Sequence, residues 1–231
     1  MKENFFKPWI GDKYHLGLKN GKKVLVLGES FYCGRNEKDT LFQCPAWEQC
    51  TDQSLKDSSK YNDNCPYYIH FGYDVILEDS PSIEIQEFLR GGKYKSYENF
   101  SEFMKEYFHL HSAQELWDRL AFTNYVQYFV KGSTPVQNIN DIGNFRSLLK
   151  IIDKLTPDII IIWGGLISQH IKRTYMKSLI QNIGNRDNIY LFDIKYHNKR
   201  YTCINPYHPS DKFGYWTNNK IFFKKALDVI F

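Results

Sequence analysis

The chain has 231 residues, of which 42% are hydrophobic and 24% charged, and its formal net charge at pH 7 is +4. These values are those of an ordinary globular protein large enough to bury a full core, and the mild positive charge permits a polyanionic partner without requiring one. Even the apolar run Ile159 to Trp163 has only the length of a strand, so the sequence offers no candidate membrane span.

The N-terminus, Met1 to Phe6, lacks the apolar core and the small-residue cleavage site of a signal peptide. We therefore expect a cytoplasmic protein whose thiols are reduced. We also expect a monomer. Its five cysteines would then be free, metal-bound or functional rather than paired in disulfides.

Short apolar runs alternate with segments of helical spacing along the chain. Val24 to Leu27 is a continuous apolar run, typical of a strand that is buried on both faces. Phe145 to Leu155 has apolar residues at helical spacing, and Pro157 follows it as a stop. The sequence predicts strands at 24–27, at 120 to about 124, at 158–163, at 188–195 and at 200–204, and helices at 83–89, 100–108, 145–155, 166–180 and 216–231.

This alternation predicts an α/β fold, specifically a three-layer α/β/α sandwich with a mostly parallel central sheet. Neither an internal repeat nor a low-complexity linker interrupts the chain, so we expect one domain over residues 1–231. A long insertion at about 34–116 separates the first two predicted strands. Its first half is polar and contains cysteines, and its second half contains the first two predicted helices.

Three polar side chains follow predicted strands that lie far apart in the sequence. Glu29 follows the first strand, Asn124 ends the second, and His208 stands after the last strand between Pro206 and Pro209. Ligands of open α/β sheets bind beyond the carboxyl ends of the strands. We therefore expect the acid, the amide and the imidazole to converge around one small cavity.

Four segments stand out in chain order: Gly28-Glu29-Ser30, Phe122 to Val126, Pro157 to Gly164, and Tyr207-His208-Pro209-Ser210. They resemble, in the same order, the motifs of the uracil-DNA glycosylase superfamily. Gly28-Glu29-Ser30 resembles the Gly-Glu-Ala/Ser-Pro-Gly motif of its iron–sulfur branch, and Tyr207-His208-Pro209-Ser210 matches its His-Pro-Ser loop. The other two segments are Phe122-Thr123-Asn124-Tyr125-Val126, which resembles a Thr-Asn-Val-Val-Lys strand end, and the strand from Pro157 to Gly164. The resemblance implies a glycosylase-like fold and hydrolysis of the N-glycosidic bond of uracil or a related damaged base in DNA.

Side-chain chemistry assigns a role to each of the three polar residues in such a reaction. His208 would donate to O2 of the departing base, where negative charge develops. Glu29 would orient a water molecule or balance the cationic sugar. Asn124 has a donor and an acceptor, which suit the N3–H and O4 edge of uracil. Each also has a structural alternative: a helix cap for Glu29, a turn former for Asn124 and an ordinary surface histidine for His208.

The resemblance implies further substrate contacts. Gly28 and Ser30 belong to the first motif, and Tyr32 stands where one branch uses a tyrosine to block the thymine methyl group. Phe42 stands where the family has a base-stacking phenylalanine, although alone it would be read as a packing residue. Ser210 would contact a phosphate or simply cap its loop.

The segment after the His-Pro-Ser loop offers DNA contacts. Lys212 would touch a phosphate, and Phe213 or Tyr215 would be the wedge that fills the space left by a flipped base. The alternative is that these aromatic residues anchor the last helix.

Four cysteines in the first part of the chain raise the question of a metal. They are Cys33, Cys44, Cys50 and Cys65. Four thiolates suffice for zinc or for an iron–sulfur cluster. However, no Cys-x-x-Cys spacing is present, and all four follow or touch the Gly-Glu motif, whereas in the iron–sulfur branch the first two precede it. The proposed reaction requires no cofactor, and the alternative role of these cysteines is that of small apolar side chains.

The first motif departs from the family pattern after Glu29. One branch has a carboxylate where this chain has Ser30, and Phe31 replaces the expected proline. The runner-up function is therefore a non-catalytic nucleic-acid or nucleotide-binding module on the same fold. An unrelated α/β hydrolase is a third possibility, although the sequence contains no Gly-x-Ser-x-Gly or phosphate-loop pattern.

Overall fold

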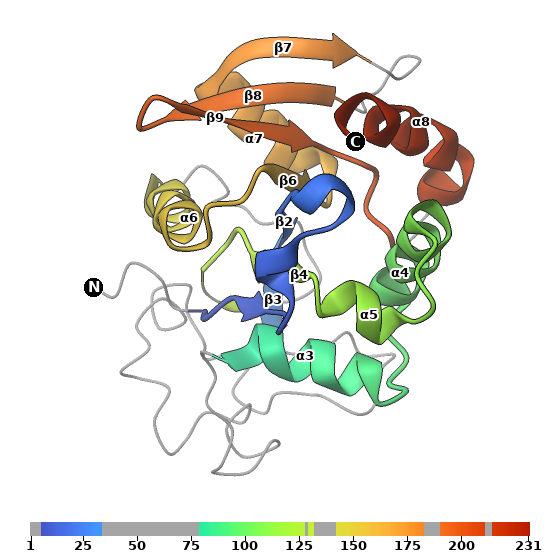
Figure 1. Ribbon diagram of the computed structural model, residues 1–231. Helices are drawn as coiled ribbons and strands as arrows, with labels where there is room; N and C mark the ends of the chain where they lie inside the picture. The colour runs from blue at the N-terminus through green and yellow to red at the C-terminus, as the bar shows by residue number, and fades with distance from the viewer. Residues whose placement is uncertain (1–5, 34–78, 128, 132–141, 183–189, 211–213) are drawn as a thin grey trace, which may run out of the picture.

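The chain folds around a mixed β-sheet, seen in a computed structural model that describes residues 6–33, 79–127, 129–131, 142–182, 190–210 and 214–231 (Figure 1). Among the residues described, the sheet has seven strands in the order β1-β4-β2-β6-β9-β8-β7. Its strands are β1 (Trp9–Ile10), β2 (Val24–Gly28), β4 (Leu120–Asn124), β6 (Ile159–Ile162), β7 (Met176–Asn182), β8 (Tyr190–Tyr196) and β9 (Lys199–Ile204). A separate parallel pair joins β3 (Phe31–Cys33) to β5 (Phe129–Lys131).

The centre of the sheet is parallel. Strands β4, β2, β6 and β9 pair in parallel, while β1, β7 and β8 add antiparallel pairings at the sides. Every residue of β2, β4 and β6 is buried, as the unbroken apolar sequences of β2 and β6 require. The register pairs Gly28 with Asn124, so the end of β2 lies beside the end of β4.

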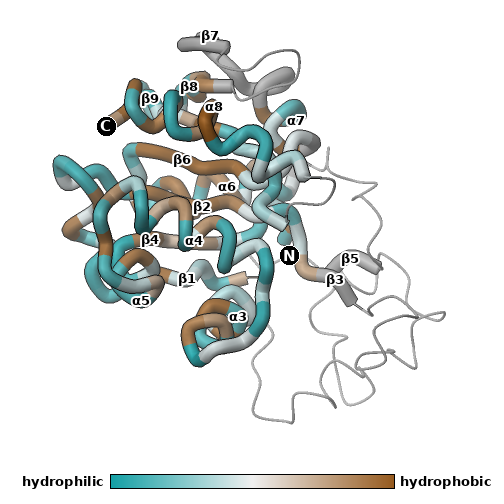
Figure 2. The backbone as a smooth tube through the Cα atoms, turned by 90° about the vertical axis from the view of Figure 1, so that its right-hand side faces the viewer, coloured by the Kyte–Doolittle hydropathy of each residue, from teal (hydrophilic) through white to brown (hydrophobic). Residues whose placement is uncertain are grey.

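Helices cover both faces of this sheet. On one face, Leu25 and Leu27 pack with α6 (Ile142–Leu155) and α7 (Gly165–Tyr175). On the other, Val24 and Val26 share a core with four helices: α3 (Ser80–Leu89), α4 (Lys95–Phe108), α5 (Ala113–Trp117) and α8 (Tyr215–Ile230). Successive strand residues therefore bury on opposite sides. The hydrophobic strands β2, β4 and β6 form the middle of the molecule in Figure 2.

The predicted α/β class is confirmed, and the predicted strands are present with ends shifted by a few residues. The hairpin between β8 and β9 turns at His197 and Asn198, which both have positive φ, as a tight two-residue hairpin requires. This hairpin and β7 make the sheet mixed at one side.

The helix predicted over 166–180 is wrong in its second half. Helix α7 ends at Tyr175, and the chain continues directly as β7 from Met176 to Asn182. Strand β7 pairs with β8, so this ladder takes up backbone groups that a longer helix would have bonded internally. Helix α5, which the sequence analysis did not predict, begins at a Ser112 cap whose hydroxyl accepts from the Glu115 N–H.

Part of the expected insertion belongs to the same core as the sheet. Residues 34–78 lie outside the described residues, whereas α3, α4 and α5 contribute Ile85, Phe100 and Trp117 to the core beneath α8. Among the helices in the described ranges, none combines the length and the apolar character that crossing a membrane requires.

Candidate functional site

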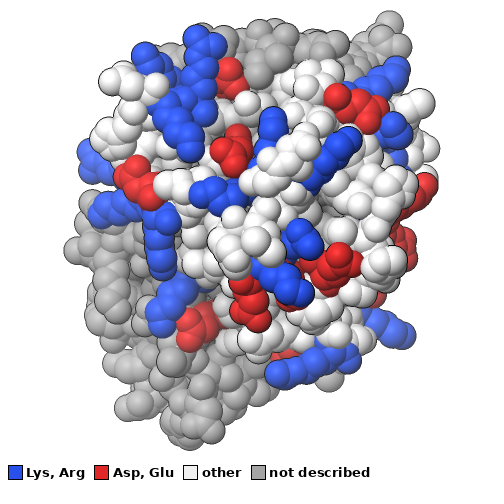
Figure 3. Space-filling model, in the orientation of Figure 1, with Lys and Arg blue, Asp and Glu red and all other residues white. Residues whose placement is uncertain are grey.

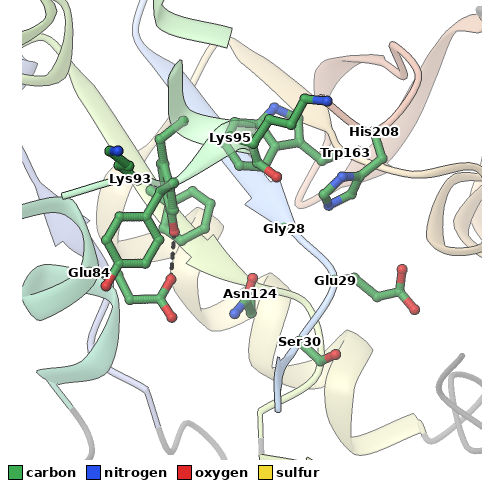
Figure 4. Close-up of a pocket in the computed structure, with 13 residues that line it drawn as sticks. Gly28, Glu29, Ser30, Glu84, Lys93, Lys95, Asn124, Trp163 and His208 are labelled. Carbon is green, nitrogen blue, oxygen red and sulfur yellow. Dashed lines mark hydrogen bonds between the residues drawn. The ribbon is translucent and has the colours of Figure 1, made fainter. Parts of the chain in front are cut away.

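A pocket of about 290 Å³ opens beyond the carboxyl ends of the parallel strands (Figure 4). It receives residues from the ends of β2, β4 and β6, from the loop after β9, and from the α3–α4 segment. Its lining consists of Gly28, Glu29, Ser30, Glu84, Lys93, Tyr94, Lys95, Ser96, Tyr97, Phe122, Asn124, Trp163 and His208. Glu29, Asn124 and His208, the three polar residues singled out in the sequence, thus line the same cavity.

The floor of the pocket is where β2 and β4 end side by side. Asn124 is 4% exposed, and its side-chain oxygen lies so close to Gly28 that a Cβ at this position would overlap it. Beyond the strands, Tyr125 N–H donates to the Gly28 carbonyl over 2.9 Å, and Val126 N–H donates to the Glu29 carbonyl over 3.0 Å. These bonds prolong the ladder past the strand ends and fix the backbone that presents Glu29.

The imidazole of His208 is held in a defined protonation state. The Ser210 backbone N–H donates to His208 Nδ1 over 3.1 Å, and the Ser210 hydroxyl lies 3.0 Å from the same atom. Because Nδ1 accepts a hydrogen bond, the neutral ring carries its proton on Nε2. Burial lowers the pKa of His208 from 6.5 to about 4, so the ring is neutral near pH 7 and Nε2–H is a donor.

Gly164, at the turn after β6, brings the acid and the imidazole to one place. A Cβ on Gly164 would lie 3.7 Å from Glu29 Oε2 and 3.9 Å from His208 Cδ2. The glycine has φ of 104°, a conformation that other residues rarely adopt. Figure 4 shows Glu29 and His208 on the same side of the pocket, with Asn124 facing them across Gly28.

The loop that carries His208 is anchored by helix α4. The Asn99 side-chain amide donates to the Pro209 carbonyl over 2.6 Å. Asn99 belongs to a 14-residue helix whose inner face is buried against the sheet. The histidine is therefore fixed from both directions, by Ser210 within the loop and by a helix that packs against it.

Aromatic rings form the apolar walls of the pocket. The Tyr97 ring lies 5.5 Å from that of Phe122 and 5.6 Å from that of Trp163, and the Trp163 ring lies 6.0 Å from that of His208. Trp163 is only 2% exposed. A flat aromatic ligand has rings to contact on these walls.

The sequence analysis missed the wall built by α3 and α4. Tyr97 OH donates to Glu84 Oε2 over 2.9 Å, and Lys93, Lys95 and Ser96 complete this side. Burial, and then the Glu84 carboxylate, raises the pKa of Tyr97 well above its usual value, so the hydroxyl remains a donor. No sequence motif identified these residues as part of a site. Trp163, which also lines the pocket, could have been predicted as a site residue because it stands at the end of a predicted strand.

The other predicted site residues are distributed as follows. Ser30 lines the pocket, and its hydroxyl is buried without a hydrogen-bond partner among the described residues. The hydroxyl of Ser210 contacts His208. Tyr32 and Cys33 belong to β3, but only their backbone is described. Phe42, Cys44, Cys50, Cys65, Lys212 and Phe213 lie outside the described residues.

Tyr215 begins helix α8 and stacks on Tyr207. The ring centroids are 5.4 Å apart with an interplanar angle of 12°, and Tyr215 is 54% exposed. The pair ties the His208 loop to α8 and leaves one aromatic ring in contact with solvent.

Within the described part of the chain, no group of three or more His, Cys, Asp or Glu side chains is arranged to hold a metal ion. Three of the four cysteines considered for such a site lie beyond that part, and Cys203 is buried in β9. The side chains that line the pocket include a carboxylate, a neutral imidazole that donates, and an amide.

Comparison with protein-family models and with curated proteins gives no match for this chain. The argument for function consequently depends on the pocket and on the sequence motifs that supply its residues.

Proposed function

We propose that this protein is a uracil-DNA glycosylase-like enzyme, built on the three-layer sandwich of that superfamily, which hydrolyses the N-glycosidic bond of uracil or a related damaged base in DNA. One observation carries the proposal: a neutral histidine with Nε2–H as donor shares a single pocket with a glutamate and a buried asparagine amide. The motifs that supply these residues occur in the order of the superfamily.

The proposed reaction breaks the bond between the sugar C1′ and the base nitrogen, and the electron pair leaves with the base. His208 Nε2–H donates a hydrogen bond to the base oxygen on which this negative charge develops. A neutral donor already in position needs no proton uptake before the bond breaks, and burial in the pocket strengthens its effect.

Glu29 acts on the sugar side. Its carboxylate stabilises the oxocarbenium-like sugar and orients a water molecule, which attacks C1′. The proton released by this water passes to Glu29 and then to the departing base, so the products are the free base and an abasic site. Gly164 leaves the space beside Glu29 in which the water would stand, because this residue has no side chain.

The floor of the pocket and its aromatic walls would recognise the base. The Asn124 amide supplies one donor and one acceptor for the edge of the base, and Tyr97, Phe122 and Trp163 supply ring contacts. A base can reach this pocket only out of the helical stack, so the enzyme would flip its target nucleotide or act on single strands.

The distribution of charge on the surface is compatible with a polyanionic partner, but the positive side chains do not gather in one continuous patch. Lys and Arg side chains are spread over the face in Figure 3, with Asp and Glu side chains among them. At the pocket itself, the exposed Lys93 and Lys95 supply positive charge.

The second candidate is a non-catalytic module that binds nucleic acid or a nucleotide in the same pocket. The specific observation in its favour is Ser30, which replaces the carboxylate that one branch uses beside the water. In this case Asn124 and the aromatic walls would bind a base, and no bond would break.

An assay on oligonucleotides separates the two candidates. A labelled strand with one uracil is incubated with the parent protein or with His208→Ala, treated with alkali to cleave abasic sites, and resolved on a gel. His111→Ala is the matched control, because His111 is an exposed histidine that does not line the pocket. Abasic product from the parent and the control, but not from His208→Ala, supports the enzyme. DNA binding without abasic product from any of the three proteins supports the module.

A further inference from the structure

The first turn of helix α4 forms one wall of the pocket. Consecutive residues from Lys93 to Tyr97 line it, and the helix begins at Lys95. Tyr94, before the helix, provides no side-chain cap, and within the described part of the chain the N–H groups of Lys95, Ser96 and Tyr97 have no hydrogen bond. The free N–H groups at the start of a helix, together with the helix dipole, attract anions. This wall therefore favours a ligand that carries negative charge.

A buried donor belongs to the same side of the pocket. Trp163 is 2% exposed and lines the pocket, and its indole N–H has no hydrogen-bond partner among the described residues. Figure 4 shows the nitrogen-bearing edge of the Trp163 ring on the side of Lys95, away from Asn124. Buried polar groups are almost always hydrogen-bonded, and an indole N–H can only donate. A ligand oxygen that accepts would satisfy this group.

Two lysines add positive charge to this wall. Lys93 and Lys95 are exposed at the rim, and neither forms an ion pair with any residue that the structure describes. The carboxylates of Glu29 and Glu84 lie away from the Trp163 ring in Figure 4. The helix N-terminus, the lysines and the indole N–H thus all favour the same kind of group, an anion with several oxygen atoms.

The pocket has room for more than the edge of a base. Its volume of about 290 Å³ is close to that of the smaller sites that hold whole small molecules, about 300 Å³. We propose that it binds a free nucleoside 5′-monophosphate, with the base on the Asn124 floor and the phosphate between the α4 N-terminus, Lys95 and Trp163. The base end of this inference rests on the proposed function, and the phosphate end goes beyond it.

Two observations favour a free nucleotide over a phosphate within a DNA strand at this wall. A phosphate monoester carries a charge between about −1.5 and −2 near pH 7, whereas each phosphate in DNA carries a single negative charge, so the monoester gains more from this positive wall. A long polyanion is bound by many lysines and arginines together, and those on the face in Figure 3 do not gather in one continuous patch.

Calorimetric titration measures what the phosphate contributes. The ligands are deoxyuridine, deoxyuridine 5′-monophosphate and the monomethyl ester of this nucleotide, which has a single negative charge like a phosphate within DNA. We expect the monophosphate to bind about thirtyfold more tightly than deoxyuridine and about threefold more tightly than the ester. Equal affinity for the monophosphate and deoxyuridine, or no binding of any ligand, overturns the phosphate site. Equal affinity for the monophosphate and the ester overturns the assignment to a free nucleotide.

Two variants assign the effect to its residues. Trp163→Phe keeps an aromatic ring and removes the N–H, so the affinity ratio of monophosphate to deoxyuridine should fall about fivefold. Trp216→Phe is its matched control, because the Trp216 indole N–H is also buried without a partner among the described residues but does not line the pocket. Lys95→Ala should lower the ratio about threefold, whereas Lys105→Ala, at the other end of α4, should leave it unchanged.

The outcome of these variants is decisive either way. An unchanged ratio in Trp163→Phe or in Lys95→Ala, or an equal loss in the matched control, overturns the phosphate site. If Trp163→Phe does not fold, the comparison of Lys95→Ala with Lys105→Ala decides, because both lysines are remote from the hydrophobic core.

The uracil oligonucleotide assay separates the failure of this inference from that of the proposed function. Abasic product from the parent protein, without tighter binding of the monophosphate, overturns the phosphate site and leaves the glycosylase. Tighter binding of the monophosphate without abasic product overturns the glycosylase and leaves a protein that binds nucleotides in this pocket.

Discussion

Acidification should destabilise the protein through His208, and the size of the effect follows from its burial. The pKa of His208 is about 4 in the folded protein and 6.5 in an unfolded chain. As the pH falls, the unfolded chain binds the proton first, so stability is lost between about pH 6.5 and pH 4. Above this window both states are neutral at this residue and the effect is absent.

The magnitude follows from the pKa difference. One pKa unit corresponds to about 1.4 kcal/mol, which gives about 3 kcal/mol for the full shift of His208. The ring is in contact with the pocket, where water screens part of the penalty, so we expect about 2 kcal/mol at about pH 4.5.

Urea unfolding of the parent and of His208→Gln measures this effect. Gln keeps a neutral acceptor and donor near the Ser210 N–H but does not titrate. Between about pH 7 and pH 4.5 the parent should lose about 2 kcal/mol more unfolding free energy than the variant. Other groups, including His170, titrate in both proteins and cancel in the difference. If the unfolding free energies of the two proteins depended equally on pH, the conclusion that His208 is buried as a neutral imidazole would be refuted.

Three further variants test the pocket. Gly28→Ala places a Cβ against the Asn124 side-chain oxygen, so nucleoside binding should be lost and the unfolding free energy should fall by about 1–3 kcal/mol in urea titration. Asn99→Ala removes the bond to the His208 loop; single-turnover base release should slow about tenfold and stability should fall by about 1 kcal/mol. The double variant of Lys93 and Lys95 to Ala should reduce the slope of log affinity for DNA against log salt by between about 1 and 2.

Matched controls accompany these variants. Gly165→Ala adds a Cβ with no atom within 4 Å and at a φ outside the left-handed region, so it adds the same methyl group without overlap or backbone strain. Gln114→Ala removes an exposed side-chain amide that donates to Asp118 at the end of α5, and Gln114 does not line the pocket. Lys154→Ala removes a lysine at the end of α6, which does not line the pocket. A control that behaves like its partner variant would contradict the proposed local cause.

The parallel centre of the sheet could be predicted because its strands have a distinctive sequence pattern. The run from Val24 to Leu27 and the four isoleucines from Ile159 are apolar without interruption, and a strand buried on both faces needs this pattern. Once the strands are parallel, the polar residues that follow them meet at one edge. This rule predicted that Glu29 and His208 would share a pocket, and the resemblance of the second strand end to a family motif added Asn124.

The wall formed by α3 and α4 could not be predicted in the same way. Glu84 and Tyr97 belong to different helices, and their contact depends on how these helices pack on each other and on the sheet. Helical spacing predicts which residues face inward, but it does not predict which element they will meet. The boundary between α7 and β7 was missed for a related reason, because pairing with β8 overrides the local helical pattern.

Helix α4 contributes to both sides of the pocket within three residues. Tyr97 belongs to the wall of the pocket, and Asn99 anchors the loop that carries His208. A helix transmits small rotations along its first turn almost rigidly, so a ligand that pushes Tyr97 aside also shifts the Pro209 carbonyl. Under the proposed function, occupancy and chemistry would therefore be mechanically coupled, because a base that fits poorly would misalign the His208 donor.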